Sequence, residues 1–175
     1  VFSQPDTTIE LSQLVIDEAN NSRLEVYKAT ALKNQGVAYL VKSDYGKALD
    51  NFQEAEKLYQ KLDNQEGIAN ILNNIGLIYN AQGDFEKALN LYEESLLIRQ
   101  EIGDQEGVAT SLNTIGNIYQ SKGDYSNALD YYQQSLDLAE EIKDKKTRAN
   151  TLNNLGLLYQ EQGSQQLAFD YFYKS

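Results

Sequence analysis

A short motif, a glycine followed three positions later by a tyrosine, returns along this chain at a constant interval. Its four copies occupy residues 36–39, 76–79, 116–119 and 156–159, so that each copy begins 40 residues after the previous one. A fixed period of this length is typical of a solenoid, in which each unit contacts only its neighbours. Such a stack offers a long surface, which favours binding another chain over enclosing a small substrate.

One period reads as two helices joined by a tight turn. Between residues 67 and 102 the apolar and small residues recur at spacings of three, four or seven, in two successive segments. This is helical periodicity. Between the segments, Gly83 can adopt the left-handed conformation that ends a helix, and Asp84 can cap the free amides of the next one. The unit is therefore predicted to be a helical hairpin.

Small and aromatic residues recur at matching places in the hairpins. Small residues are expected where two helix backbones approach closely, and large aromatic rings fill the space around them. The small positions are Gly76, Gly116 and Gly156 in the first helix with Ala88, Ala128 and Ala168 in the second. The aromatic positions are Tyr39, Tyr79, Tyr119, Tyr159, Phe52, Tyr92, Tyr132 and Phe172. We interpret these rings as core residues rather than as a cofactor platform.

The run Gly-Asp-Tyr/Phe-x-x-Ala-Leu-x-x-Tyr, with the small and aromatic residues before it, resembles the tetratricopeptide repeat. The resemblance covers nearly the whole chain and implies an all-α fold, a right-handed α–α superhelical solenoid of tandem helical hairpins. The period of 40 exceeds the usual period of about 34 and is similar to a longer-helix subclass. That subclass includes kinesin light chains, the Leu-Gly-Asn-rich spindle-orientation adaptors and bacterial signalling proteins. The first unit departs from the pattern, with Ser43 in place of the turn glycine.

The repeat divides the chain into six expected segments. Residues 1–6 are expected to be a disordered or signal-peptide-like remnant, and residues 7–22 an N-terminal capping helix. The four repeat units are then residues 23–66, 67–106, 107–146 and 147–175, the last of them truncated in its second helix. The apolar surface that such a truncated repeat exposes makes self-association through the C-terminal repeat an expectation.

Composition excludes several functions. Lys and Arg number 15 against 26 Asp and Glu, which gives a net charge of −11. Phosphate backbones and anionic lipid are therefore poor partners, and we expect no nucleic acid and no membrane contact by this segment. The chain has no His and no Cys, and no phosphate-binding or nucleophile-elbow motif. These absences remove the commonest general base, the thiolate nucleophile and the usual metal ligands. We expect no catalysis, no cofactor and no metal site.

Family resemblance implies that the first helix of each unit lines the concave face. The side chains on that face of these helices are rich in carboxamides, which carry a donor and an acceptor on one short fork and can bond the backbone of an extended peptide. The candidate peptide-binding residues are Asn70, Asn73, Asn74, Asn80, Asn113, Asn117, Gln120, Asn150, Asn153 and Asn154.

Two roles remain open for part of this set. Asn74 and Asn154 can equally bind a ligand or tie neighbouring repeats together by side-chain-to-backbone hydrogen bonds. For Asn73, Asn113, Asn117 and Asn153 the ligand role is favoured. The carboxylate clamp of some family members is absent, because Lys33 is followed by Val37 where that clamp uses Asn. A protein or peptide ligand of neutral to mildly basic character is the expectation.

The leading hypothesis is a non-catalytic module that binds an extended peptide of a partner protein in its groove. The alternative is an extracytoplasmic sensory or input region of a bacterial signalling protein, either a histidine kinase or a transcription regulator. The start Val1-Phe2-Ser3-Gln4 resembles the tail of a secretory signal and favours export, which leaves a periplasmic and a cytoplasmic location open. No apolar run of 18 residues occurs, so no transmembrane helix is expected within these residues.

Overall fold

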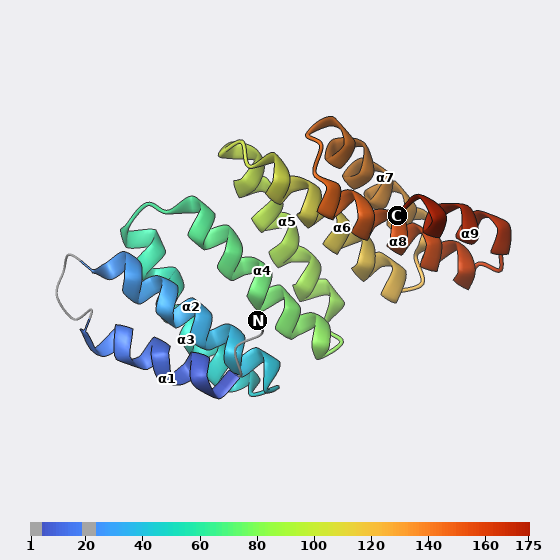
Figure 1. Ribbon diagram of the computed structural model, residues 1–175. Helices are drawn as coiled ribbons and strands as arrows, with labels where there is room; N and C mark the ends of the chain where they lie inside the picture. The colour runs from blue at the N-terminus through green and yellow to red at the C-terminus, as the bar shows by residue number, and fades with distance from the viewer. Residues whose placement is uncertain (1–4, 19–23) are drawn as a thin grey trace. The chain divides into compact units, whose positions relative to one another are not determined.

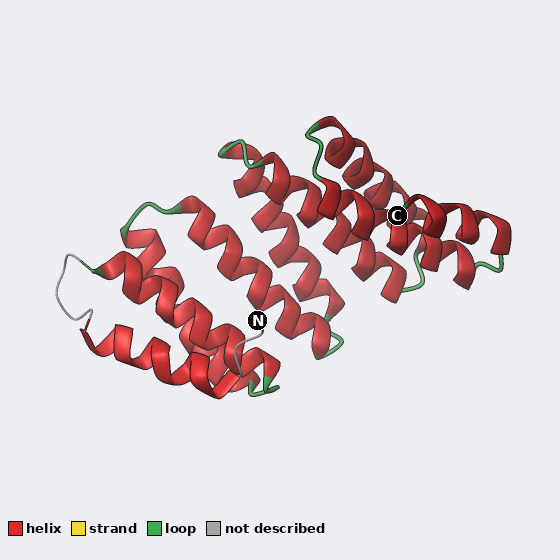
Figure 2. Ribbon diagram, in the orientation of Figure 1, coloured by secondary structure: helices red, strands yellow, loops and turns green. Residues whose placement is uncertain are grey.

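The computed structural model describes residues 5–18 and 24–175, which contain nine α-helices and no strand (Figures 1 and 2). The predicted all-α fold is confirmed. The helices are α1 (Pro5–Glu18), α2 (Glu25–Val41), α3 (Tyr45–Lys61), α4 (Gln65–Ala81), α5 (Phe85–Glu101), α6 (Gln105–Ser121), α7 (Tyr125–Glu141), α8 (Lys145–Glu161) and α9 (Gln165–Lys174).

The helices form two compact units, residues 1–83 and 84–175. In the first unit α1 packs against α2, and α3 packs against both α2 and α4. In the second unit α6 contacts α5, α7 and α8, while α8 also contacts α7 and α9. Antiparallel neighbours therefore form hairpins, and α6 lies beside α8, as expected for first helices of consecutive repeats.

Helix α1 starts earlier than the predicted capping helix. The helix begins at Pro5, two residues before the predicted capping helix, because proline is pre-organised for the first helical position and Asp6 complements the helix dipole. The rest of the prediction for residues 1–6, and the end of the capping helix at residues 19–22, lie outside the described residues. Among the described helices, none is long and apolar enough to cross a membrane.

The turns inside the hairpins have the predicted chemistry. Gly83, Gly123 and Gly163 all have positive φ, between 76° and 78°. Asp84 and Asp124 accept hydrogen bonds from the backbone amides three residues later, at 3.3 and 3.2 Å. Ser43, which departs from the glycine pattern, adopts the same left-handed conformation with φ 59°. The repeat geometry thus imposes this conformation even on a residue that disfavours it.

The turns between hairpins also require one residue in the left-handed conformation, and two of these residues are not glycine. The left-handed positions there are Asp63 with φ 52°, Gly103 with φ 73° and Lys143 with φ 59°. Glycine adopts this region freely and Asp tolerates it, whereas a lysine side chain crowds the following carbonyl. Lys143 therefore carries local backbone strain that Gly103 avoids.

In three hairpins the core depends on a helical glycine that faces an aromatic ring. A Cβ atom built on Gly36 would lie 2.5 Å from the ring of Phe52, and one on Gly116 would lie 2.6 Å from Tyr132. On Gly156 it would lie 2.5 Å from Phe172. Real Cβ atoms do not approach other atoms this closely, so the ring can occupy its site only because the side chain is absent. The predicted packing of small residues against aromatics is confirmed at these three places.

Replacing Gly116 with alanine tests this packing. We expect the Gly116→Ala protein to lose about 1–3 kcal/mol of unfolding free energy, because the buried Tyr132 ring must move. Gly46→Ala is the matched control, since the nearest atom to a Cβ there is 4.0 Å away in the first turn of α3. That change should be neutral or stabilising by up to about 1 kcal/mol. Equal effects of the two changes in urea denaturation would contradict the packing assignment.

Replacing Lys143 with glycine tests the strain in the turn before α8. Relief of the left-handed conformation should raise the free energy of unfolding by about 1 kcal/mol, even though a charged surface residue is lost. The reciprocal change Gly103→Lys should lower it by a similar amount. A destabilised Lys143→Gly protein would show that the lysine side chain makes stabilising contacts instead.

Candidate functional site: an amide cluster on two neighbouring helices

Six of the predicted carboxamides lie on α6 and α8 of the second unit, the two first helices that pack side by side (Figure 1). On α8, successive spacings of four, three and four residues separate Lys146, Asn150, Asn153 and Leu157. Residues at these spacings lie on one face of a helix, so the four form a single stripe. All four of those residues are exposed. On α6 the equivalent series includes Asn113 and Asn117, and the next residue of that face is Gln120. The structure therefore brings these two sets onto neighbouring helices.

Asn154 bridges the two helices through its side-chain amide. Its Nδ2 group donates to Oδ1 of Asn113 at 3.0 Å and to Oδ1 of Asn117 at 2.9 Å. Since an amide nitrogen carries two hydrogens, both are used. Of the two roles left open for Asn154, the bridging one is realised here, but between side chains and not from side chain to backbone.

Tyr132 of α7 belongs to the same cluster. Its hydroxyl lies 2.7 Å from Oδ1 of Asn117 and 2.7 Å from Oε1 of Gln120. Because a phenol has one hydrogen, it donates to one of them, and the other contact requires an amide N–H₂ group to face the hydroxyl. Burial raises the pKa of the Tyr132 phenol well above its ordinary value, so the hydroxyl stays protonated at neutral pH.

The sequence pattern predicts Tyr132 as a core residue and does not assign its hydroxyl to this cluster. The available signal was that the equivalent residues of the first and last hairpins, Phe52 and Phe172, have no hydroxyl. A ring that packs with or without a hydroxyl does not require one for packing. This signal does not identify a partner by itself, since the hydroxyl of Tyr92, at the equivalent position one repeat earlier, is buried without a hydrogen-bond partner among the described residues.

Several groups of the predicted carboxamides in the second unit have no hydrogen-bond partner among the described residues. Asn150 and Asn153 are exposed, and their side chains have no hydrogen-bond partner among the described residues. The amide nitrogens of Asn113 and Asn117 are likewise without a partner in that part of the chain, since only their oxygens accept bonds. These two kinds of free group differ, because both the oxygen and the nitrogen of Asn150 and Asn153 are free, whereas in Asn113 and Asn117 the oxygen already accepts a hydrogen bond and the N–H₂ group is free.

The other four predicted residues, Asn70, Asn73, Asn74 and Asn80, lie on α4 of the first unit, where each is partly buried. The Oδ1 atom of Asn73 is fully buried without a hydrogen-bond partner among the described residues. Leaving a buried acceptor unsatisfied costs about 1–3 kcal/mol, which is unusual for a purely structural side chain.

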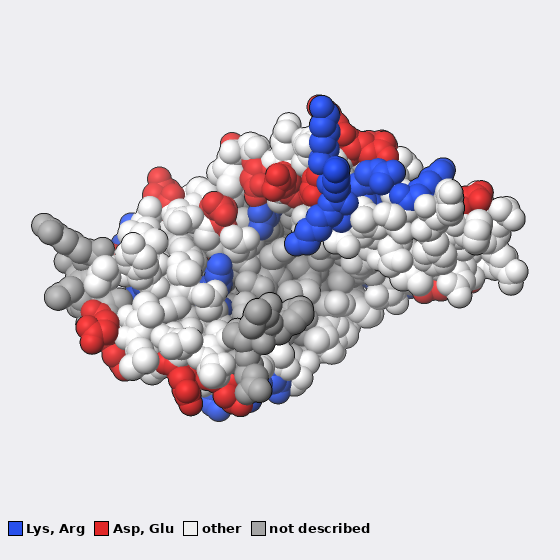
Figure 3. Space-filling model, viewed as in Figure 1, with Lys and Arg blue, Asp and Glu red and all other residues white. Residues whose placement is uncertain are grey.

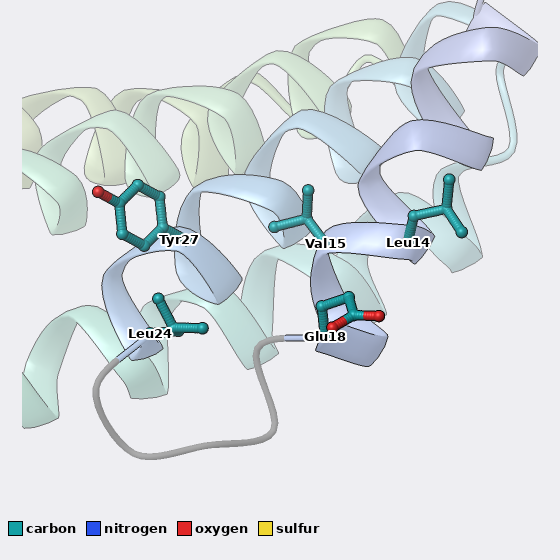
Figure 4. A pocket seen from close by; sticks show the side chains of 5 residues that line it. All are labelled: Leu14, Val15, Glu18, Leu24 and Tyr27. Carbon is teal, nitrogen blue, oxygen red and sulfur yellow. The ribbon is translucent and has the colours of Figure 1, made fainter.

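A hollow of about 470 Å³ lies between α1 and α2 in the first unit (Figure 4). The described residues that line it are Leu14, Val15, Glu18, Leu24 and Tyr27, whose ionisable groups are one carboxyl and one phenol. No convergent set of acid, base and nucleophile is present among these described residues. Within the described ranges, no group of three or more His, Cys, Asp or Glu residues is placed to hold a metal ion.

The two asparagines at residues 153 and 154 provide a matched test of the bridge. Asn154→Ala removes two hydrogen bonds between α6 and α8 and should lower the unfolding free energy by about 1–2 kcal/mol. Asn153→Ala, at an exposed neighbouring position, should change it by less than about 0.5 kcal/mol. Thermal and urea denaturation of both proteins measure the difference. Equal losses would show that the amide bridge does not stabilise the pair of helices.

Comparison with solved structures shows similar folds at low sequence identity. The chain is similar to BtubC (BKLC) from P. vanneervenii, with a TM-score of 0.79, 21% identity, and coverage of 97% of this chain and 72% of that one. It also resembles a Rap protein complexed with Competence and Sporulation Factor, with a TM-score of 0.78 and 18% identity over 86% of this chain and 42% of that one.

A third similar structure is the signal transduction ATPase PH0952 from Pyrococcus horikoshii, described as having a tetratricopeptide repeat sensor. Its TM-score is 0.80 at 20% identity, covering 97% of this chain and 28% of that one. A search of curated proteins found no match. The sequence model of the tetratricopeptide repeat matches residues 27–101, 67–141 and 107–175, three overlapping segments that together include most of the sequence. The chain therefore belongs to the tetratricopeptide-repeat family.

Proposed function

We propose that this chain is a non-catalytic interaction module that binds an extended peptide segment of a partner protein along its first helices. The family supports the coarser part of this proposal, since its repeats are typically interaction scaffolds. The observation that carries the finer part is the free hydrogen-bonding capacity on α6 and α8. Asn150 and Asn153 are exposed without partners among the described residues, next to a cluster that has spare N–H groups.

The free groups suit a peptide backbone. An extended segment presents alternating C=O and N–H groups and needs partners of both kinds when water is displaced. The spare amide hydrogens of Asn113 and Asn117 can bond peptide carbonyls, while the oxygens of Asn150 and Asn153 can accept from peptide N–H groups. Asn154 and Tyr132 hold the cluster in place and need no contact with the ligand. This division refines the predicted site into contact residues and positioning residues.

We further propose that the repeat boundaries are those of the sequence period, so that each of the units 23–66, 67–106, 107–146 and 147–175 contributes one first helix. On α4 the contact residues are then Asn70, Asn73, Asn74 and Asn80, and on α6 and α8 they include Gln120. The buried, unpartnered oxygen of Asn73 supports this assignment, because a ligand donor would remove its cost.

The net charge of −11 favours a ligand of neutral to mildly basic overall character and disfavours nucleic acid and anionic membranes. The similar Rap protein was crystallised with Competence and Sporulation Factor, which supports a bound partner on this fold. Self-association is a further proposal, supported by Phe169 and Tyr173 of α9, which are 63% and 84% exposed and lie stacked with ring centres 6.4 Å apart. Their apolar surface is available to another copy.

A second candidate function is the input region of a signalling protein. The description of a tetratricopeptide repeat as the sensor of the Pyrococcus horikoshii protein favours it at the level of fold. A sensor and an adaptor use the same surface, so both require the ligand contacts proposed for α6 and α8. Measurement of binding to the isolated repeats tests both.

The proposal is tested with an array of random peptides of about 12 residues, which reach about 40 Å when extended. The wild-type chain should retain a subset of peptides, and the variant Asn150→Ala/Asn153→Ala should bind them at least about ten-fold more weakly, since two side chains that bond the backbone are lost. Fluorescence anisotropy on the best peptides gives the affinities.

Folding is controlled by circular dichroism, where this variant should match the wild type because both residues are exposed. Gln166→Ala is a control of the same chemistry on α9, outside the first helices. It should leave peptide affinity unchanged. Retention of full affinity by the Asn150→Ala/Asn153→Ala protein would refute this stripe as the binding surface.

A further inference from the structure

The turn from α7 into α8 has the opposite charge to the equivalent turn one repeat earlier. Residues 143, 145 and 146 are all lysine, whereas the positions 40 residues before them are Gly103, Gln105 and Glu106. In a chain with net charge −11 this is a local reversal. Figure 3 shows Lys and Arg side chains gathered over the α7–α8 turn and the start of α8.

None of the three lysines forms a direct ion pair with a described residue, although the charge of Lys146 acts on the nearby Asp144 carboxylate. All three are exposed, and no ion pair joins them to another of the described residues. The neighbouring Arg148, by contrast, is paired with Glu140 at 3.3 Å. Asp144 lies between the lysines, but its carboxylate accepts hydrogen bonds from the amides of Lys146 and Thr147 at 3.0 and 3.2 Å. Asp144 therefore caps α8, and its pKa is lowered chiefly by hydrogen bonding with Thr147, then by the amide of Lys146 and by the positive charge of Lys146.

The positions of the lysines oppose local stability. Lys143 has a left-handed backbone with φ 59°, where the preceding repeat has a glycine. Lys145 and Lys146 place positive charge in the first turn of α8, where the helix dipole favours acidic residues such as the Glu106 of α6. Solubility does not explain them, because adding cations to an acidic chain reduces its net charge. Residues that break local rules in this way are expected at functional surfaces.

One of the lysines, Lys146, lies on the same face of α8 as the proposed peptide-binding asparagines. Lys146 precedes Asn150 by one helical turn and shares its stripe with Asn153, so a peptide that bonds these two asparagines ends or passes beside the ammonium group. The exposed carboxylates in the last turn of α7 are Glu140 and Glu141. Glu140 pairs with Arg148, and no ion pair joins either carboxylate to the three lysines.

We propose that the lysine turn, defined as Lys143, Lys145 and Lys146, binds acidic residues of the partner peptide at the α8 end of the groove. This inference rests on the proposed peptide-binding function and adds to it a local requirement for Asp or Glu at one end of an otherwise neutral to mildly basic ligand. A protein segment fits better than a nucleic acid or a lipid surface, because the negative field of the rest of the chain repels an extended polyanion.

The test compares three proteins on the same array of random peptides of about 12 residues. The first is the wild type, and the second is Lys145→Gln/Lys146→Gln, which removes two positive charges. The third is Lys57→Glu, which changes the net charge by the same amount at an exposed position of α3, outside the first helices. All three should have the same circular dichroism spectrum.

We expect wild type and Lys57→Glu to select peptides enriched in Asp or Glu at one end. The Lys145→Gln/Lys146→Gln protein should lose this enrichment and bind the best acidic peptides about three- to ten-fold more weakly, as for two exposed ion pairs. It should keep its affinity for the same peptides with Asp and Glu changed to Asn and Gln. The difference should largely disappear at about 1 M salt, where charges are screened beyond about 3 Å.

Two results would overturn the inference separately from the groove. If wild type selects peptides with no acidic preference, or if the lysine variant keeps the preference, the lysine turn does not read the ligand, although peptide binding stands. If wild type binds no peptide at all, the proposed function fails and the inference fails with it. Loss of the preference in Lys57→Glu as well would assign the effect to net charge and not to this turn.

Discussion

The close approach of two helices at a glycine is the constraint on which the hairpins depend. At Gly36, Gly116 and Gly156 an aromatic ring of the following helix occupies the space that a Cβ atom would need. Once that ring is seated, the helix axes and the rotation of each helix are set, and with them the face that carries polar side chains. The orientation of the asparagines on α6 and α8 thus follows from the contact that the same helices make with these rings.

Local chemistry explains why the turns and the packing were predictable. The left-handed conformation of Gly83 and the capping by Asp84 depend on a few neighbouring residues, so the sequence pattern sufficed to predict them. The same reasoning identified Ser43 as a departure, and the structure shows it forced into the left-handed region. The start of α1 was harder to predict, because a proline that begins a helix and one that precedes it look alike in a single sequence.

The placement of the carboxamides on α6 and α8 was predictable from the sequence, but their hydrogen bonds were not. Helical periodicity places Asn113, Asn117 and Asn154 on facing sides of neighbouring helices, yet it does not say which amide bonds which. That depends on rotamers and on competition among partners, such as the phenol of Tyr132, 15 residues from Asn117 in the chain. The role of Asn154 shows the limit, since a bond to backbone was considered and bonds to two side chains were found.

The polar side chains of α6 and α8 therefore form two populations with different consequences for stability and binding. Amides that satisfy one another, as Asn154 does, lower the cost of a polar surface and hold α6 beside α8, but a ligand gains little by competing with them. Exposed amides such as Asn153, and unpaired ammonium groups such as Lys146, contribute little to folding and retain their capacity for a partner. The lysine turn opposes both the helix dipole and the backbone preference at Lys143, so a contribution to folding does not explain it. Its presence is better explained by a ligand than by the fold.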